Sequence, residues 1–122
     1  MKIFLSFAAV LASLFGAGLM VNPEGFYTPT GMVLTPMLAT IAQAHGATLI
    51  GMAVVLWLAR NADPAGLKAV LTGNLVVQVL SLYVAFHTMQ LGAGTKVAPA
   101  FVIHITLGVL YTYFLLRLPK KA

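Results

Sequence analysis

The chain has 122 residues, of which 61% are apolar and only 7% are charged, with seven Lys or Arg and two Asp or Glu. An ordinary soluble domain carries about 25% charged residues, so this chain cannot cover a water-facing surface, and it is too hydrophobic for disorder. The net charge of +5 comes from basic residues separated by long apolar runs, which form no stripe for nucleic acid, and the absence of cysteine excludes disulfides and thiolate chemistry.

Four stretches of the chain contain no charged residue, and each is long enough for a transmembrane helix, which needs about 20 mainly apolar residues. These stretches are 3–23, 25–59, 69–95 and 97–116. In a bilayer every backbone group must be hydrogen-bonded within the protein, which favours helices. We therefore predict an all-α integral membrane protein with one transmembrane domain, residues 1–122, built as a four-helix up-down-up-down bundle. The predicted helices cover about 3–21, 36–60, 64–91 and 96–118.

The first predicted helix resembles a secretory signal peptide in one respect. Lys2 precedes an apolar run that contains the small residues Gly16, Ala17 and Gly18. The run is longer than the roughly 7–15 apolar residues of such a peptide. We therefore expect this helix to be retained as the first membrane span.

Capping residues and glycines predict the other helix ends. Thr35 and Asp63 are N-capping residues that each precede a proline, so the second and third helices are predicted to begin at those prolines. The segment from Gly92 to Gly94 is predicted to end the third helix in a short turn. Thr95 is then expected to cap the fourth helix.

The basic residues predict the orientation, since the cytoplasmic flanks of membrane spans are enriched in Lys and Arg. Four spans put both termini and the loop at 60–68 on one side of the membrane. That side carries Lys2, Arg60, Lys68, Arg117, Lys120 and Lys121. The opposite side carries Lys96 and Glu24. We therefore expect a multi-pass protein of the bacterial inner membrane with both termini in the cytoplasm.

Polar residues inside a membrane span are energetically costly, so they are the first candidates for function. The third predicted helix has four of them at offsets that place them on one face. They are Asn74, Gln78, Ser81 and Thr88. The favoured interpretation is hydrogen bonding between helices, and the alternative is the polar lining of a path for a small solute.

Three histidines also lie within the predicted spans: His45, His87 and His104. From the helical rise, His45 and His104 lie at similar depths slightly to the outer side of the midplane, so this pair is the candidate for ligating a haem iron or a metal. Alternatively, each donates a hydrogen bond to a neighbour, since Tyr111 lies on the same face as His104 and Thr48 is close to His45. We favour hydrogen bonding because neither a cysteine nor a membrane carboxylate accompanies the pair.

Two pairs of small residues four positions apart occur in the second predicted helix: Ala42 with Gly46, and Ala47 with Gly51. Such pairs let helix backbones approach closely. We expect them to serve helix packing within one bundle, with dimerisation as the alternative.

No reactive constellation accompanies these features in the sequence. The spans contain no Asp or Glu, which argues against a proton-coupled multidrug antiporter, and no Lys that could carry retinal. The sequence also lacks a Gly-rich phosphate loop, a metalloprotease motif and a Ser-His-Asp set. We therefore expect no catalytic residues, no bound metal and no cofactor, with haem as the alternative.

The stretch from Gln43 to Arg60 reads QAHGATLIGMAVVLWLAR and is followed by a Pro-containing turn and another apolar helix. It resembles small bacterial four-helix inner-membrane proteins of the DoxX-like sort, which share this hydropathy profile and a Gly-Ala pair early in the second helix. Here the pair is Gly46-Ala47, and His45 stands where many such chains have a basic residue. The resemblance covers roughly the middle half of the chain and implies a fold rather than an activity.

Together these features favour a non-enzymatic integral membrane protein that acts as an accessory or structural subunit of a membrane complex, or as a small homo-oligomer. Its expected partners are the lipid bilayer and other membrane-protein subunits or further copies of itself, and not nucleic acid. Two alternatives stay open. One is a carrier or pore for a small solute that uses the polar face of the third helix, and the other is a haem- or metal-binding redox subunit that uses His45 and His104.

Overall fold

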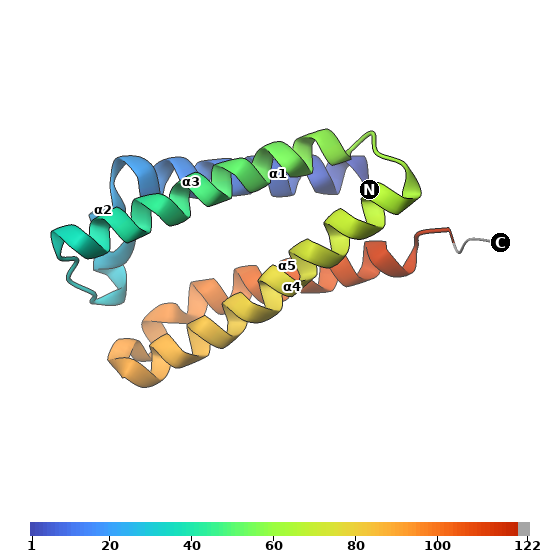
Figure 1. Ribbon diagram of the computed structural model, residues 1–122. Coiled ribbons are helices and arrows are strands. Elements are labelled where there is room, and N and C mark those ends of the chain that lie inside the picture. The colour runs from blue at the N-terminus through green and yellow to red at the C-terminus, as the bar shows by residue number, and fades with distance from the viewer. Residues whose placement is uncertain (120–122) are drawn as a thin grey trace. The chain divides into compact units, whose positions relative to one another are not determined.

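The computed structural model describes residues 1–119, and over this range it consists of helices and their connections (Figure 1). The four long helices are α1, Lys2–Val21; α3, Pro36–Ala59; α4, Pro64–Thr88; and α5, Ala98–Leu116. The predicted all-α class is confirmed. Two of the basic residues that predicted the orientation, Lys120 and Lys121, lie outside the described residues.

The chain divides into two compact units, Met1–Arg60 and Asn61–Ala122. Helix α1 pairs with α3 in the first unit, and α4 pairs with α5 in the second. Each unit is an antiparallel helical hairpin. The assembly of all four helices into one up-down-up-down bundle stays a prediction.

The helices of the first unit pack through glycines. A β-carbon added to Gly46 of α3 would lie 2.7 Å from the carbonyl oxygen of Gly16 on α1, so the two backbones are in close contact. The side-chain amide of Gln43 donates a hydrogen bond to the carbonyl oxygen of Met20 (3.1 Å). Because residue 43 meets residue 20 and residue 46 meets residue 16, the two helices run antiparallel.

The connection between α1 and α3 contains two short helices that the sequence patterns did not indicate: α2, Pro23–Tyr27, and a 3-10 helix, Thr28–Thr30. The side chain of Asn22 caps α2 by accepting a hydrogen bond from the backbone N–H of Gly25 (2.9 Å). The ring of Phe26 packs edge-on against the ring of Phe15, with centroids 5.6 Å apart. These contacts hold the connection against the end of α1.

The two proline-linked N-caps predicted from the sequence are present. The hydroxyl of Thr35 accepts a hydrogen bond from the backbone N–H of Leu38 (3.3 Å) at the start of α3. The carboxylate of Asp63 accepts one from the backbone N–H of Gly66 (2.7 Å) at the start of α4. A proline follows each cap, so the predicted starts of both helices are confirmed.

The turn between α4 and α5 is built on two glycines with positive φ angles. Gly92 has φ +110° and Gly94 has φ +55°, which are conformations that glycine adopts without a steric cost. Gly92 lies in a π-helical segment, Met89–Ala93, and a 3-10 helix, Gly94–Val97, follows it. The predicted glycine turn is therefore confirmed, but it begins after Thr88, earlier than residue 91.

The predicted cap of the last helix was wrong. Thr95 lies inside the 3-10 helix, and α5 begins at Ala98 with Val97 as its N-cap, without a capping side chain. The tight 3-10 turn uses the residues that the sequence pattern had assigned to the first turn of the helix. At the other end α5 stops at Leu116 rather than at residue 118, because the chain tightens there: the N–H of Arg117 bonds to the carbonyl three residues back.

Three helical stretches of the described chain are long and apolar enough to cross a membrane: Lys2–Val21, Pro36–Ala59 and Pro64–Leu116. The third contains both α4 and α5 with the glycine turn between them. Many large apolar side chains on these helices are exposed, among them Ile3 (87%), Leu58 (69%) and Leu116 (81%). Large exposed apolar side chains in this number are unusual for a soluble protein and are suited to contact with lipid.

Candidate functional site

Four polar side chains meet inside the α4–α5 hairpin. Asn74 and Gln78 of α4 are 7% and 5% exposed, and Tyr111 of α5 is 1% exposed. His104, also on α5, is half-buried beside Gln78. The polar face predicted for the third helix therefore meets polar side chains of the next helix, and we call these four residues the polar cluster.

Two hydrogen bonds of the polar cluster cross between the helices. The Nδ1 atom of His104 lies 2.8 Å from the Oε1 atom of Gln78, and the hydroxyl of Tyr111 donates to the Oδ1 atom of Asn74 over 3.4 Å. The Gln78 oxygen can only accept, so in this arrangement the Nδ1 atom of a neutral His104 carries the proton. The first bond is short and the second is at the long end of the accepted range.

Two further hydrogen bonds orient the amides within α4. The Nδ2 atom of Asn74 donates to the carbonyl oxygen of Val70 (2.9 Å), and the Nε2 atom of Gln78 donates to the carbonyl oxygen of Asn74 (3.4 Å). Both amide nitrogens are thereby used on their own helix, which turns the amide oxygens toward α5. Over residues 1–119, no buried side-chain polar atom is left without a hydrogen-bond partner.

The sequence spacing explains why the four residues meet. Asn74 and Gln78 are one helical turn apart, and His104 and Tyr111 are two turns apart, so each pair occupies one face of its helix. The glycine turn reverses the chain, so the later residue of α4 meets the earlier residue of α5. Asn74, Gln78 and His104 were candidates from the sequence. Tyr111 was expected on the same face as His104, but its pairing with Asn74 was not predicted.

The other two residues of the predicted polar face contribute differently. Thr88 bonds within its own helix, its hydroxyl donating to the carbonyl oxygen of Val84 (2.9 Å). Ser81 is half-buried, on the same face as Gln78. The crossing hydrogen bonds thus occur at Asn74 and Gln78, which precede Ser81 on α4.

The three histidines have different surroundings. His45 is exposed on α3 of the first unit, whereas His104 belongs to the second unit and is hydrogen-bonded to Gln78. His87 stacks on the ring of Tyr83, with centroids 6.3 Å apart. The part of the chain that the structure describes contains no group of three or more side chains able to hold a metal ion. Ligation by His45 and His104 stays a prediction.

The two pairs of small residues on α3 also differ. Ala42 and Gly46 are buried, and Gly46 contacts α1. Ala47 and Gly51 are exposed, and a β-carbon at Gly51 would meet nothing within 4 Å in the described chain outside its chain neighbours and its own helix backbone. Packing within the chain therefore uses the first pair. Gly46 meets Gly16 of α1, which from the sequence was expected only as part of a stretch that resembles a signal peptide. The small size of Gly16 was the signal that could have revealed the contact.

The end of α3 carries a second group of polar contacts. Arg60 lies over the ring of Trp57, with the guanidinium carbon 3.3 Å from the ring centroid. Its Nε atom donates to the carbonyl oxygen of Trp57 (2.7 Å), and its Nη1 atom donates to the hydroxyl of Ser6 on α1 (3.2 Å). An arginine and a tryptophan at a helix end are typical of the membrane–water interface.

An apolar groove of about 530 Å³ opens beside the polar cluster. Its lining includes Gln78 and His104 and is otherwise mostly aliphatic, with Gly108 on the α5 side. The cluster holds two amides, an imidazole and a phenol, which donate and accept hydrogen bonds. These groups form two hydrogen bonds between α4 and α5 and two within α4.

Comparison of the chain with protein-family models, with curated proteins and with solved structures found no match. The resemblance to small four-helix membrane proteins of the DoxX-like sort therefore stays a prediction.

Proposed function

We propose that this chain is a non-enzymatic integral membrane protein that acts as an accessory or structural subunit of a membrane complex, or as a small homo-oligomer. The observation that supports this most directly is the use of its polar side chains. The buried amides of α4 bond to α5 and to their own helix, while large apolar side chains face outward. Such a protein presents packing surfaces rather than a reactive centre.

The energetics of a bilayer agree with this role. Lipid tails are as apolar as leucine side chains, so helices in a membrane associate through close packing and interhelical hydrogen bonds. The contact between Gly16 and Gly46 supplies the first of these, and the bond between Gln78 and His104 supplies the second. The exposed pair Ala47 and Gly51 offers a further small-residue surface to another membrane helix.

A carrier or pore for a small solute has less support. That function would need the Asn74–Gln78 face to line a path, and both side chains are more than nine-tenths buried between α4 and α5. Their amide groups are already hydrogen-bonded within the hairpin. Uptake of solutes into proteoliposomes should therefore be the same for the wild type and for Gln78→Leu.

Purification in a mild detergent tests the proposed role. We expect the chain to run as a homo-oligomer or to retain another membrane protein when it is isolated from its native membrane. Crosslinking before solubilisation, followed by mass spectrometry, identifies which of the two occurs. A stable monomer with no crosslinked partner would contradict the proposal.

We also propose that both termini face the cytoplasm of a bacterial cell. In the first unit Lys2 and Arg60 lie at the same end of the hairpin, and in the second unit Lys68 and Arg117 do so. These are the basic ends that the positive-inside rule assigns to the cytoplasm. The glycine turn with Lys96 would then face the periplasm.

Reporter fusions check this orientation. Alkaline phosphatase should be inactive when fused after Ala122 and active when inserted at Gly94, because the enzyme folds only in the periplasm. A cytoplasmic reporter should give the opposite pattern at the same two positions. Phosphatase activity at Ala122 would contradict the orientation.

A further inference from the structure

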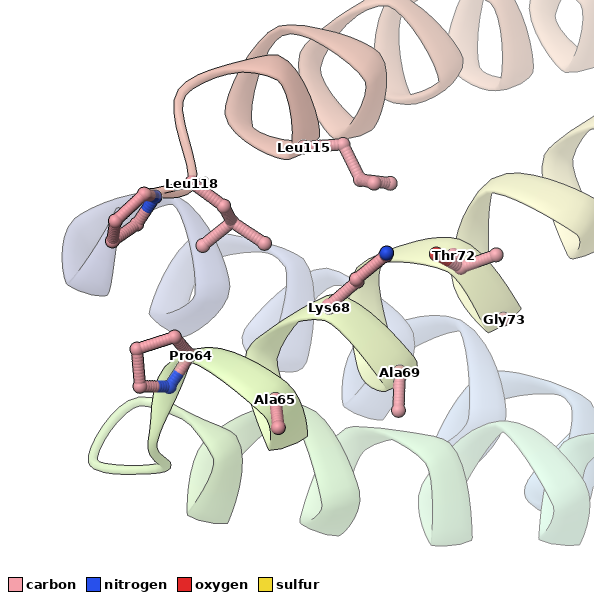
Figure 2. A pocket seen from close by; sticks show the side chains of 9 residues that line it. Pro64, Ala65, Lys68, Ala69, Thr72, Gly73, Leu115 and Leu118 are labelled. Atoms are coloured by element: carbon pink, nitrogen blue, oxygen red, sulfur yellow. The ribbon is translucent and has the colours of Figure 1, made fainter. Parts of the chain in front are cut away.

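The open end of the α4–α5 hairpin contains a cavity of about 680 Å³. Its walls come from the first three turns of α4 and from the end of α5 with the residues that follow it (Figure 2). In Figure 2 the side chain of Lys68 extends along α4 toward Thr72, and Leu115 and Leu118 lie across from it. The volume is within the range of roughly 300–1,000 Å³ that is usual for sites that hold small molecules.

The cavity combines one cationic group with an apolar wall. Lys68 is its one charged lining residue among residues 1–119, and its ammonium group makes no ion pair or hydrogen bond with the described chain. Asp63, the acidic residue closest in sequence, is occupied in capping α4 through Gly66. The wall facing Lys68 is formed by the aliphatic side chains of Leu115 and Leu118.

Thr72 adds a polar group next to this cation. Four threonines on these helices donate their hydroxyl hydrogen bond back to a carbonyl oxygen four residues earlier: Thr40, Thr48, Thr88 and Thr112. Thr106 of α5 makes no such bond within residues 1–119. Thr72 makes no such bond within residues 1–119. Its hydroxyl is therefore available to a ligand on the same face of α4 as Lys68, one helical turn away.

We propose that this cavity binds the headgroup of an anionic phospholipid. The lipid phosphate lies against the ammonium group of Lys68 and the hydroxyl of Thr72, and an acyl chain follows Leu115 and Leu118. This inference rests on the proposed membrane insertion, which places Lys68 roughly 6 Å inside the start of α4, at the level of the headgroups. Basic pockets between membrane helices on the cytoplasmic side are suited to such lipids.

The apolar wall decides between a lipid and a free phosphate. A water-soluble phosphate would use only the polar half of the cavity and would leave Leu115 and Leu118 facing water. A phospholipid covers both halves, and the bilayer supplies it by lateral diffusion. A membrane lipid is therefore the occupant that matches both halves of the cavity.

Native mass spectrometry of the full chain in dodecyl maltoside, titrated with phosphatidylglycerol, tests the site. Removing the cation in Lys68→Gln should lower the association constant about fivefold, which is the effect expected of one basic residue at an anionic lipid surface. Lys68→Arg should bind like the wild type. Lys96→Gln is the matched control, because Lys96 is an exposed lysine outside the cavity and should leave binding unchanged.

Three outcomes would overturn the proposal. If Lys68→Gln bound the lipid as tightly as the wild type, the Lys68 ammonium group would not contribute to binding. If Lys96→Gln lost as much affinity as Lys68→Gln, the attraction would be nonspecific. Displacement of the lipid by excess glycerol 3-phosphate would show that the headgroup alone is the ligand. Membrane insertion is tested separately with alkaline carbonate. Release of the chain from membranes would contradict insertion, whereas a chain that stays in the membrane but does not bind lipid through Lys68 would contradict only the lipid site.

Discussion

Replacing Gly46 with valine should disrupt the α1–α3 hairpin, whereas the same change at Gly51 should leave it intact. A β-carbon at Gly46 would lie 2.7 Å from the backbone oxygen of Gly16 and 3.0 Å from the β-carbon of Leu19. Neither atom belongs to the mobile end of a side chain, so the two helices must move apart. Overpacking of this kind costs about 1–3 kcal/mol, and loss of the close backbone contact puts this change at the upper end.

Gly51→Val is a matched control because it makes the same change in helix propensity on the same helix. Apart from its chain neighbours and the backbone of its own helix, no atom of the described chain lies within 4 Å of a β-carbon at this position. Thermal unfolding in detergent, followed by circular dichroism, should give a melting temperature several degrees lower for Gly46→Val than for Gly51→Val. Equal melting temperatures would show that the glycine contact does not determine the stability of the hairpin.

The helices could be predicted from the sequence because each of their signals is local. The apolar runs set their lengths, and the proline-linked caps at Thr35 and Asp63 set two of their starts. The turn at Gly92 was less predictable in detail. Its glycines predicted a chain reversal. The π-helical segment followed by a 3-10 helix depends on how α4 and α5 pack, which a local sequence pattern does not show.

Only part of the polar cluster could be predicted, because the faces of the helices follow from local spacing and the contacts between helices do not. Helical periodicity places Asn74 and Gln78 on one face, and the cost of leaving amides unbonded in a membrane requires partners. The partners lie on another helix, so identifying them needs the register of the hairpin. Given the glycine turn, that register brings Gln78 opposite His104 and leaves Tyr111 for Asn74.

Packing contacts that join residues far apart in the sequence were the least predictable. Gly16 and Gly46 are thirty positions apart in the chain, and small residues are frequent enough here that no single pair is conspicuous. Likewise, the hydrogen bond from Arg60 to Ser6 joins the end of α3 to the first turns of α1. Nothing in either local sequence points to the other residue, so such contacts emerge only from the folded hairpin.

Replacing Tyr111 with alanine should destabilise the α4–α5 hairpin far more than replacing it with phenylalanine. Tyr111 is 1% exposed and is among the largest fully buried side chains of the described residues. Truncating a buried aromatic side chain to alanine leaves a cavity and typically costs about 3–5 kcal/mol. Phenylalanine keeps the ring and removes only the hydrogen bond to Asn74, which is long at 3.4 Å, and such bonds in membranes average about 0.6 kcal/mol.

Unfolding in mixed micelles with increasing sodium dodecyl sulfate, read by the loss of resistance to protease, measures the two effects. Tyr113→Ala is the comparison for a tyrosine two residues further along α5, since Tyr113 is 47% exposed and lies outside the polar cluster. We expect the order of stability to be wild type, then Tyr111→Phe and Tyr113→Ala close to it, and Tyr111→Ala far below. If Tyr111→Phe were as unstable as Tyr111→Ala, the hydroxyl bond rather than the packing of the ring would hold the hairpin together, and the polar cluster would be its main support.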